Sequence, residues 1–188
     1  MSRMLGIAFT AALMLFAAAV QADDYSDTLT LFKNAKESGA NLKTAYGYAV
    51  FPTIGKGGLV VGGAYGKGRV YEKGAYIGDT SMTQVSVGFQ AGGQGYSQLI
   101  LFQDKRALDE FTNGNFEFSA DASAVAITAA AGASAGTTGA NSSASGGMKD
   151  ATNAGHYYKG MAVYTIVKGG AMYQATVAGQ KFKYTPKS

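Results

Sequence analysis

The stretch Ala64-Tyr-Gly-Lys-Gly-Arg-Val-Tyr71 alternates between two kinds of side chain along its whole length. The even-numbered positions are small or apolar, and the odd-numbered positions hold, in order, Tyr65, Lys67, Arg69 and Tyr71. Because successive side chains of a strand point to opposite faces, this spacing predicts a β-strand with one face of small residues and one of tyrosines and cations. The Lys73-Gly74 pair that follows predicts a turn.

Further short strands are expected on both sides of this stretch, separated by glycine-rich turns. They are expected at residues 59–61, 84–91, 97–102, 116–128, 157–167, 171–177 and 180–184, with turns at 55–58, 92–93, 168–170 and 178–179. In the run at 84–91, Val85 and Val87 alternate with polar residues, which predicts a half-buried strand. The last three runs are expected to complete a meander.

Two helices are expected beside these strands. Residues 24–45 carry apolar side chains at spacings of three and four, and Lys33, Lys36 and Lys43 lie largely off that stripe. Such a helix could lie on a membrane, but its stripe is narrow and lacks tryptophan, so packing on the domain's own core is favoured. A short helix is expected at 104–112. The predicted fold class is α+β: a predominantly antiparallel sandwich or barrel-like sheet with an N-terminal and a mid-chain helix.

The first residues predict export. A short positive start is followed by the apolar run Leu5–Val20 and by small residues that favour cleavage after Ala22. A membrane anchor is the alternative, but the run is short for a bilayer span and Asp23-Asp24 follows at once. Residues 1–22 are therefore expected to be a signal peptide, and residues 23–188 a single domain that is periplasmic or secreted and peripheral on a membrane.

The composition limits how this domain is stabilised and what it binds. It has no cysteine, so its stability must come from its core rather than from disulfides. The net charge of the full chain, +4, includes Arg3 of the predicted signal peptide; the remaining basic excess is compatible with an anionic membrane surface, whereas nucleic acid is disfavoured by the export signal. Residues 129–147 are almost all Ala, Gly, Ser and Thr, with no bulky side chain to pack, and are expected to form a flexible segment.

No catalytic motif is evident. The glycines at 63–68 do not form a dinucleotide or phosphate loop, because no helix pattern follows and Gly66-Lys67 is followed by glycine. There is no Gly-x-Ser-x-Gly elbow, and a catalytic triad would have to use His156, which is the single histidine. We therefore expect a protein that is not an enzyme and that has no cofactor and no bound metal.

An ordered series of short motifs resembles the SYLF-domain family, a lipid-binding family that includes yeast actin-binding proteins. The series covers nearly the whole domain and reads Ala45-Tyr-Gly-Tyr-Ala-Val-Phe-Pro52, Gly57-Gly-Leu-Val-Val-Gly-Gly63, Gly66-Lys-Gly68, Ser86-Val-Gly-Phe-Gln90, Gly92-Gly-Gln94, Ala120-Asp-Ala-Ser-Ala124 and Lys168-Gly-Gly170. One departure lies just before Ala120, where members often have Gly-Trp and this chain has Asn115-Phe-Glu-Phe118. Phe116 can replace the aromatic core contact.

The resemblance implies a compact lipid-binding domain without catalytic residues. Eukaryotic members are associated with phosphoinositide membranes and actin, whereas bacterial members are exported. Actin and phosphoinositides are not expected in a periplasm, so an anionic bacterial phospholipid is the expected ligand. The alternatives are a protein-interaction or envelope-structural module that docks an envelope protein, and, less favoured, an undetected hydrolase of envelope polymers.

The candidate head-group-binding residues combine cations with amphipathic rings, which suit an anionic interface with an apolar layer beneath it. They come from the alternating stretch and its flanks: Lys56, Tyr65, Lys67, Arg69, Tyr71 and Lys73. Auxiliary candidates are the helix lysines Lys33, Lys36 and Lys43. The alternation fixes which residues share a face but does not say which face is exposed.

Overall fold

The computed structural model describes residues 24–57, 61–87, 94–119, 122, 124–127, 157–168 and 177–188. The predicted signal peptide and the small-residue segment at 129–147 lie outside these ranges. The same is true of residues 88–91 and 171–176 of two predicted strands and of His156.

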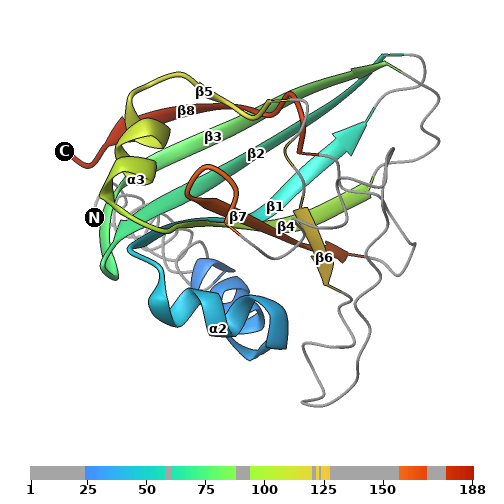
Figure 1. The fold of residues 1–188 in the computed structure, drawn as a ribbon. Coiled ribbons are helices and arrows are strands. Elements are labelled where there is room, and N and C mark those ends of the chain that lie inside the picture. The colour runs from blue at the N-terminus through green and yellow to red at the C-terminus, as the bar shows by residue number, and fades with distance from the viewer. Residues whose placement is uncertain are drawn as a thin grey trace, which may run out of the picture.

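Within these described ranges, eight strands form one sheet in the order β5-β8-β3-β2-β1-β4-β7-β6 (Figure 1). In chain order they are β1 (Gly47–Gly57), β2 (Val61–Glu72), β3 (Ala75–Val87), β4 (Gln94–Phe102), β5 (Phe116–Glu117), β6 (Ala124–Ile127), β7 (Met161–Lys168) and β8 (Lys181–Pro186). Neighbouring strands are antiparallel except for β6 and β7, which are parallel. The predicted α+β class with a mainly antiparallel sheet is confirmed.

The helices also follow the prediction, with one difference. Residues 24–34 are helical, and α2 (Lys36–Thr44) follows after a bend at Ala35, so the predicted N-terminal helix is two helices. The Ser38 hydroxyl stabilises the bend by donating a hydrogen bond to the Phe32 carbonyl at 2.6 Å. The mid-chain helix is α3 (Lys105–Thr112), and the Asp104 side chain caps it by accepting from the backbone N–H of Ala107 at 2.9 Å.

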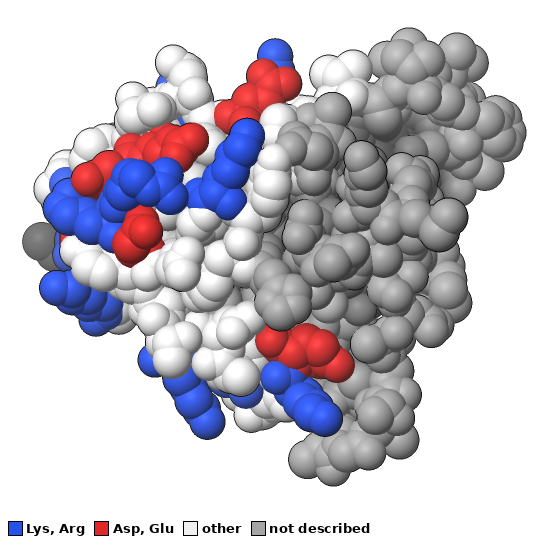
Figure 2. Space-filling model, in the orientation of Figure 1, with Lys and Arg blue, Asp and Glu red and all other residues white. Residues whose placement is uncertain are grey.

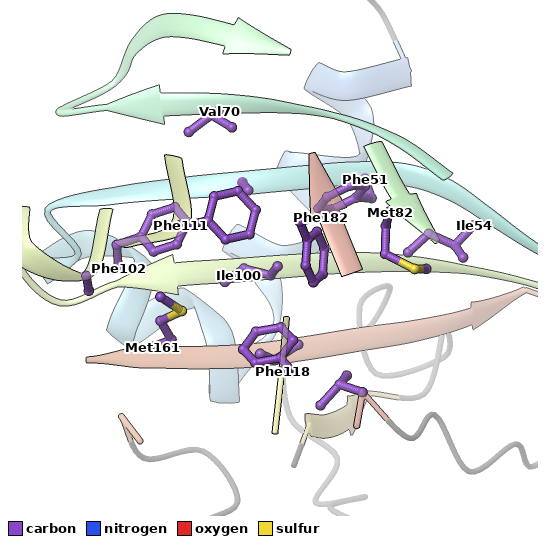
Figure 3. Packing of buried hydrophobic residues seen from close by; sticks show 14 of the residues in the cluster. Phe51, Ile54, Val70, Met82, Ile100, Phe102, Phe111, Phe118, Met161 and Phe182 are labelled. Atoms are coloured by element: carbon purple, nitrogen blue, oxygen red, sulfur yellow. The ribbon is translucent and has the colours of Figure 1, made fainter. Parts of the chain in front are cut away.

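The sheet is curled around an inner core. The rings of Phe51 in β1 and Phe182 in β8 have centroids 5.7 Å apart, although β2 and β3 lie between these strands. In a flat sheet their backbones would be about 14 Å apart, so the sheet bends into a half-barrel. Figure 3 shows the aromatic and aliphatic side chains that fill it, with Phe111 of α3 beside Phe102 and Phe182.

A second core lies on the outer face of the sheet, where the N-terminal helices pack. Phe32 is fully buried there with Val50 of β1, Leu99 of β4 and Tyr164 of β7. The Asn41 side-chain amide donates a hydrogen bond to the Tyr164 hydroxyl at 2.6 Å. The apolar stripe of these helices therefore packs on the domain's own core, as the favoured interpretation predicted.

The first strand differs from the prediction because it contains Pro52. β1 runs from Gly47 to Gly57, so residues 55–57 are strand residues and the turn predicted over them was wrong. Pairing shifts by one residue between Val50 and Ile54 against β2 and between Phe51 and Ile54 against β4, which places a β-bulge at Pro52 and Thr53. A proline cannot donate to the ladder and is tolerated inside a sheet only at a bulge or an edge.

Two further predictions fail for reasons of tertiary contact. Gln84 is buried and donates a hydrogen bond to the Ala178 carbonyl at 2.9 Å, whereas Val85 is 78% exposed. The apolar side chains of this run were expected on the buried face, and at Val85 that was wrong. β7 pairs with β4 and β8 pairs with β3, on opposite sides of the sheet, so the predicted C-terminal meander was also wrong.

Candidate functional site

The residues that the structure describes cover only half of the outer face of the sheet. The core beneath the N-terminal helices draws on β1, β4, β7 and β6, with Tyr71 of β2 at its margin. Beyond that margin, the outward side chains of β2, β3 and β8 remain open to solvent. We name this surface the open strip and define it by its exposed residues: Tyr65, Lys67, Thr83, Val85, Lys181 and Lys183.

The centre of the open strip is a pair of lysines. Ser81 of β3 pairs with Lys67 on one side and with Lys183 on the other, so the three side chains lie in one row. The two lysine backbones are about 10 Å apart, and their flexible stems allow both ammonium groups to approach an anion between them. Among the carboxylates that the structure describes, none lies within 4.0 Å of either group.

The next row of the strip is less charged. Thr83 pairs with Tyr65 and with Lys181. The Lys181 ammonium lies 3.6 Å from the Glu117 carboxylate, so this pair adds no net charge. Tyr65 is 51% exposed, and Val85 lies one row further along β3. The strip therefore places cations beside an exposed ring and an exposed aliphatic side chain.

Arg69 and Tyr71 lie on the predicted face but are drawn away from solvent. The Arg69 guanidinium lies 4.4 Å from the centroid of the Tyr25 ring, and its Nε lies 4.0 Å from the Asp79 carboxylate. Burial raises the pKa of Tyr25, and the nearby guanidinium partly offsets this rise. Tyr71 stacks on Tyr48 with ring centroids 4.9 Å apart. The helix of residues 24–34 thus divides the predicted face into a covered and an open part.

Of the two flanking lysines, Lys73 does not join the central pair. Lys73 lies in the β2–β3 turn, as predicted, with a φ of 49°, six residues from Lys67 along β2 and therefore about 20 Å away. Its ammonium lies 5.1 Å from the Tyr46 ring centroid. Lys56 is paired through its backbone with Ala64, and its side chain lies outside what the structure describes.

The auxiliary lysines lie on the N-terminal helices. Lys33, Lys36 and Lys43 are all exposed, because the apolar stripe of these helices faces the sheet. They lie on the same side of the sheet as the open strip, but on elements that cover its other half. They therefore form a separate group of cations.

The charged side chains of α3 are paired with one another. On α3, Lys105 bridges Asp109 at 2.7 Å and Arg106 bridges Glu110 at 3.1 Å. Figure 2 shows the resulting interleaved positive and negative side chains over the region of α3. Beside α3, a shallow pocket of about 110 Å³ has Phe116, Phe118 and Met161 in its lining. It is small for a ligand site, because such pockets usually measure several hundred Å³.

The described part of the chain holds neither a metal-binding cluster nor a membrane-spanning helix. It contains no group of three acidic or histidine side chains that could hold a metal ion. None of its helices combines the length and the apolar character that a membrane-spanning segment requires. Its arrangement is suited to binding anions at a surface.

Sequence reasoning missed Lys181 and Lys183. The alternation in Lys181-Phe-Lys-Tyr184 places the two lysines on one face of a strand. Nothing local indicates that this strand pairs with β3, over 90 residues earlier, and that pairing brings Lys183 beside Lys67.

Two comparisons with known proteins bear on the family of this chain. A family model named Ysc84, described as "Las17-binding protein actin regulator", matches residues 83–185, more than half of the chain. Beta cell expansion factor A of Aeromonas veronii is 28% identical over 158 residues, which are 82% of this chain and 51% of that protein. The chain therefore spans about half the length of this curated relative.

Proposed function

The chain belongs to the Ysc84 family, also called the SYLF family, whose domains are associated with lipid and actin binding, and on this premise we propose that it is a non-enzymatic module that binds anionic phospholipid at a bacterial envelope. The observation that carries the proposal is the row of Lys67 and Lys183 beside the exposed Tyr65 and Val85. Phosphate groups attract the two ammonium groups, and the ring and the valine suit the apolar layer below.

Vesicle co-sedimentation tests this proposal. The domain of residues 23–188 should bind vesicles that contain phosphatidylglycerol and should bind phosphatidylcholine vesicles much less. Each basic side chain near an anionic surface contributes about 1 kcal/mol, so Lys67→Glu with Lys183→Glu should weaken binding by about thirtyfold or more. Added salt should have the same effect, because charges are screened beyond about 8–10 Å at moderate ionic strength. Arg69 is left unchanged, since its packing on Tyr25 would confuse binding with stability.

The matched control is Lys33→Glu with Lys43→Glu on the N-terminal helices. It changes the net charge by the same amount on exposed side chains outside the open strip. A much smaller loss than in the strip variant would support the strip as the binding surface. An equal loss would mean that net charge decides, and a larger loss would move the site to the helices.

Protein docking is the second candidate, and the family description favours it because it names a protein as the bound partner. In that case the same strip would contact an envelope protein. If the folded domain binds neither type of vesicle, the lipid proposal is rejected and protein docking remains.

Export is part of the proposal. The sequence of residues 1–22 supports export. An exported mature domain would lie in the periplasm or outside the cell. N-terminal sequencing of the protein recovered from the cell envelope should begin at Asp23. An envelope-located chain that still begins with Met1 would reject cleavage.

A further inference from the structure

The open strip is graded along its length. Its rows run from a carboxylate at one end, through the two lysines, to apolar side chains at the other. Asp79 of β3 pairs with Arg69 and with Thr185 in the first row, and Ser81 separates Lys67 from Lys183 in the second. The third row holds Tyr65 and Thr83, and the fourth holds Val85 beside Gly63.

The distances between these rows match the layers of a membrane interface. Rows are two residues apart, so Val85 lies about 7 Å beyond Tyr65 and about 14 Å beyond the lysine row. The polar layer on each side of a bilayer core is about 5–8 Å thick, and interfacial segments bury about 5–10 Å into it. With the strands tilted from the membrane normal, a valine at the acyl boundary places flexible lysines at the level of the phosphates.

The exposure of the valine supports this orientation. Val85 is 78% exposed, and its β2 neighbour is Gly63, which has no side chain to cover it. A tyrosine one row behind suits the wet edge of the apolar layer. The exposed carboxylate of Asp79 lies at the far end of the strip, where repulsion from anionic lipid is weakest. Glu117 lies nearer the apolar end, but Lys181 neutralises it.

We propose that the domain docks on anionic phospholipid bilayers with the Val85 end of β3 inserted, the Lys67–Lys183 row at the phosphates and the Asp79 row in water. This inference rests on the proposed function and adds to it an orientation and a depth for each row. A domain that lay flat on its strip would bring all four rows to the same depth.

The natural chain suits a direct test, because it contains no cysteine. Val85→Cys, Thr83→Cys and Thr185→Cys each provide a single exposed site on the outer face, at three positions along the strip. Each is labelled with an environment-sensitive fluorophore and mixed with phosphatidylglycerol vesicles. The emission should rise several-fold at Val85, less at Thr83 and hardly at Thr185. Quenching by lipid-bound nitroxides should follow the same order.

A variant without a label makes the test independent of the probe. Val85→Thr keeps the β-branched shape and should leave folding intact, but it should lower vesicle affinity by about fivefold in a way that added salt does not change. Vesicle binding with equal signals at Val85 and Thr185, or with the larger signal at Thr185, would overturn the orientation and leave lipid binding standing. If the unlabelled parent domain does not bind phosphatidylglycerol vesicles, both the orientation and the proposed lipid binding are overturned.

Discussion

Gly68 and Gly55 lie in neighbouring strands of the sheet but have opposite surroundings. A Cβ added at Gly68 would lie 2.6 Å from two carbons of the Phe51 ring, whereas a Cβ at Gly55 would meet nothing within 4 Å. Neither glycine has a φ in the left-handed region, so both positions accept alanine as far as the backbone is concerned. Replacing each glycine by alanine therefore compares only the space that is available for the added methyl group.

The packing around Phe51 sets the expected magnitude. Its ring is fully buried and contacts Phe182 at a centroid distance of 5.7 Å, so it cannot move aside freely. Overpacking of this kind costs about 1–3 kcal/mol, and Gly68→Ala should lower the free energy of unfolding by that amount. Gly55→Ala should change it little or raise it by about 0.4–1 kcal/mol, because alanine restricts the unfolded chain.

Urea unfolding of residues 23–188, followed by circular dichroism, measures both variants. The midpoint should fall for Gly68→Ala and hold or rise for Gly55→Ala, with similar slopes for both. Phe51→Leu in the Gly68→Ala background should recover part of the loss, because it removes the ring that the new methyl group meets. Equal destabilisation by the two alanines, or no recovery in the double variant, would refute the packing argument.

Three further predictions concern single contacts. Asp104→Ala removes the N-terminal cap of α3 and should lower the free energy of unfolding, measured with urea, by about 1 kcal/mol, whereas Asp104→Asn should retain most of the stability. Gln180→Leu removes the side chain that accepts a hydrogen bond from the buried amide of Gln98 at 2.9 Å, and it should lower the free energy of unfolding by about 1–3 kcal/mol. Leucine at both positions should lower it by less than the sum of the two single changes. Burial raises the pKa of Tyr48 and Tyr164, so the unfolded chain releases these protons first. The contribution of these two tyrosines to the free energy of unfolding should therefore be constant below about pH 10 and fall above it, and a urea midpoint that does not change above about pH 10 would contradict this.

The elements that the sequence predicts well are those whose patterns are local. The alternation of Ala64–Tyr71 reappears in the structure: its even-numbered residues are buried over the inner core, and its odd-numbered residues are exposed at Tyr65 and Lys67 and half-buried at Arg69 and Tyr71. The helix at 104–112 follows from Ala107, Leu108 and Phe111, which share one helical face, and all three are buried in α3. In each case neighbouring residues carry all the information that the prediction needs.

The predictions that fail depend on distant partners. Glycine and proline near Pro52 are typical of turns, but the bulge absorbs the proline and the strand continues to Gly57. Gln84 is buried because the Ala178 carbonyl accepts its hydrogen bond, a contact between residues 94 positions apart. The candidate site divides in the same way: Tyr65 and Lys67 were predicted together, whereas Lys183 joins them only through the pairing of β8 with β3.

The bulge at Pro52 acts on β1 as an insertion acts on a reading frame. Ahead of it, the odd-numbered Ala49 and Phe51 face the inner core, and behind it the even-numbered Ile54 does so. Without the bulge, the same residues in regular alternation would return Ile54 to the outer face and turn Gly55 inward, leaving a gap in the half-barrel. Removing one residue at Pro52 would instead leave Phe51 and Ile54 two positions apart and both inward, as a deletion restores a reading frame, so relatives that keep the fold should tolerate a one-residue deletion here.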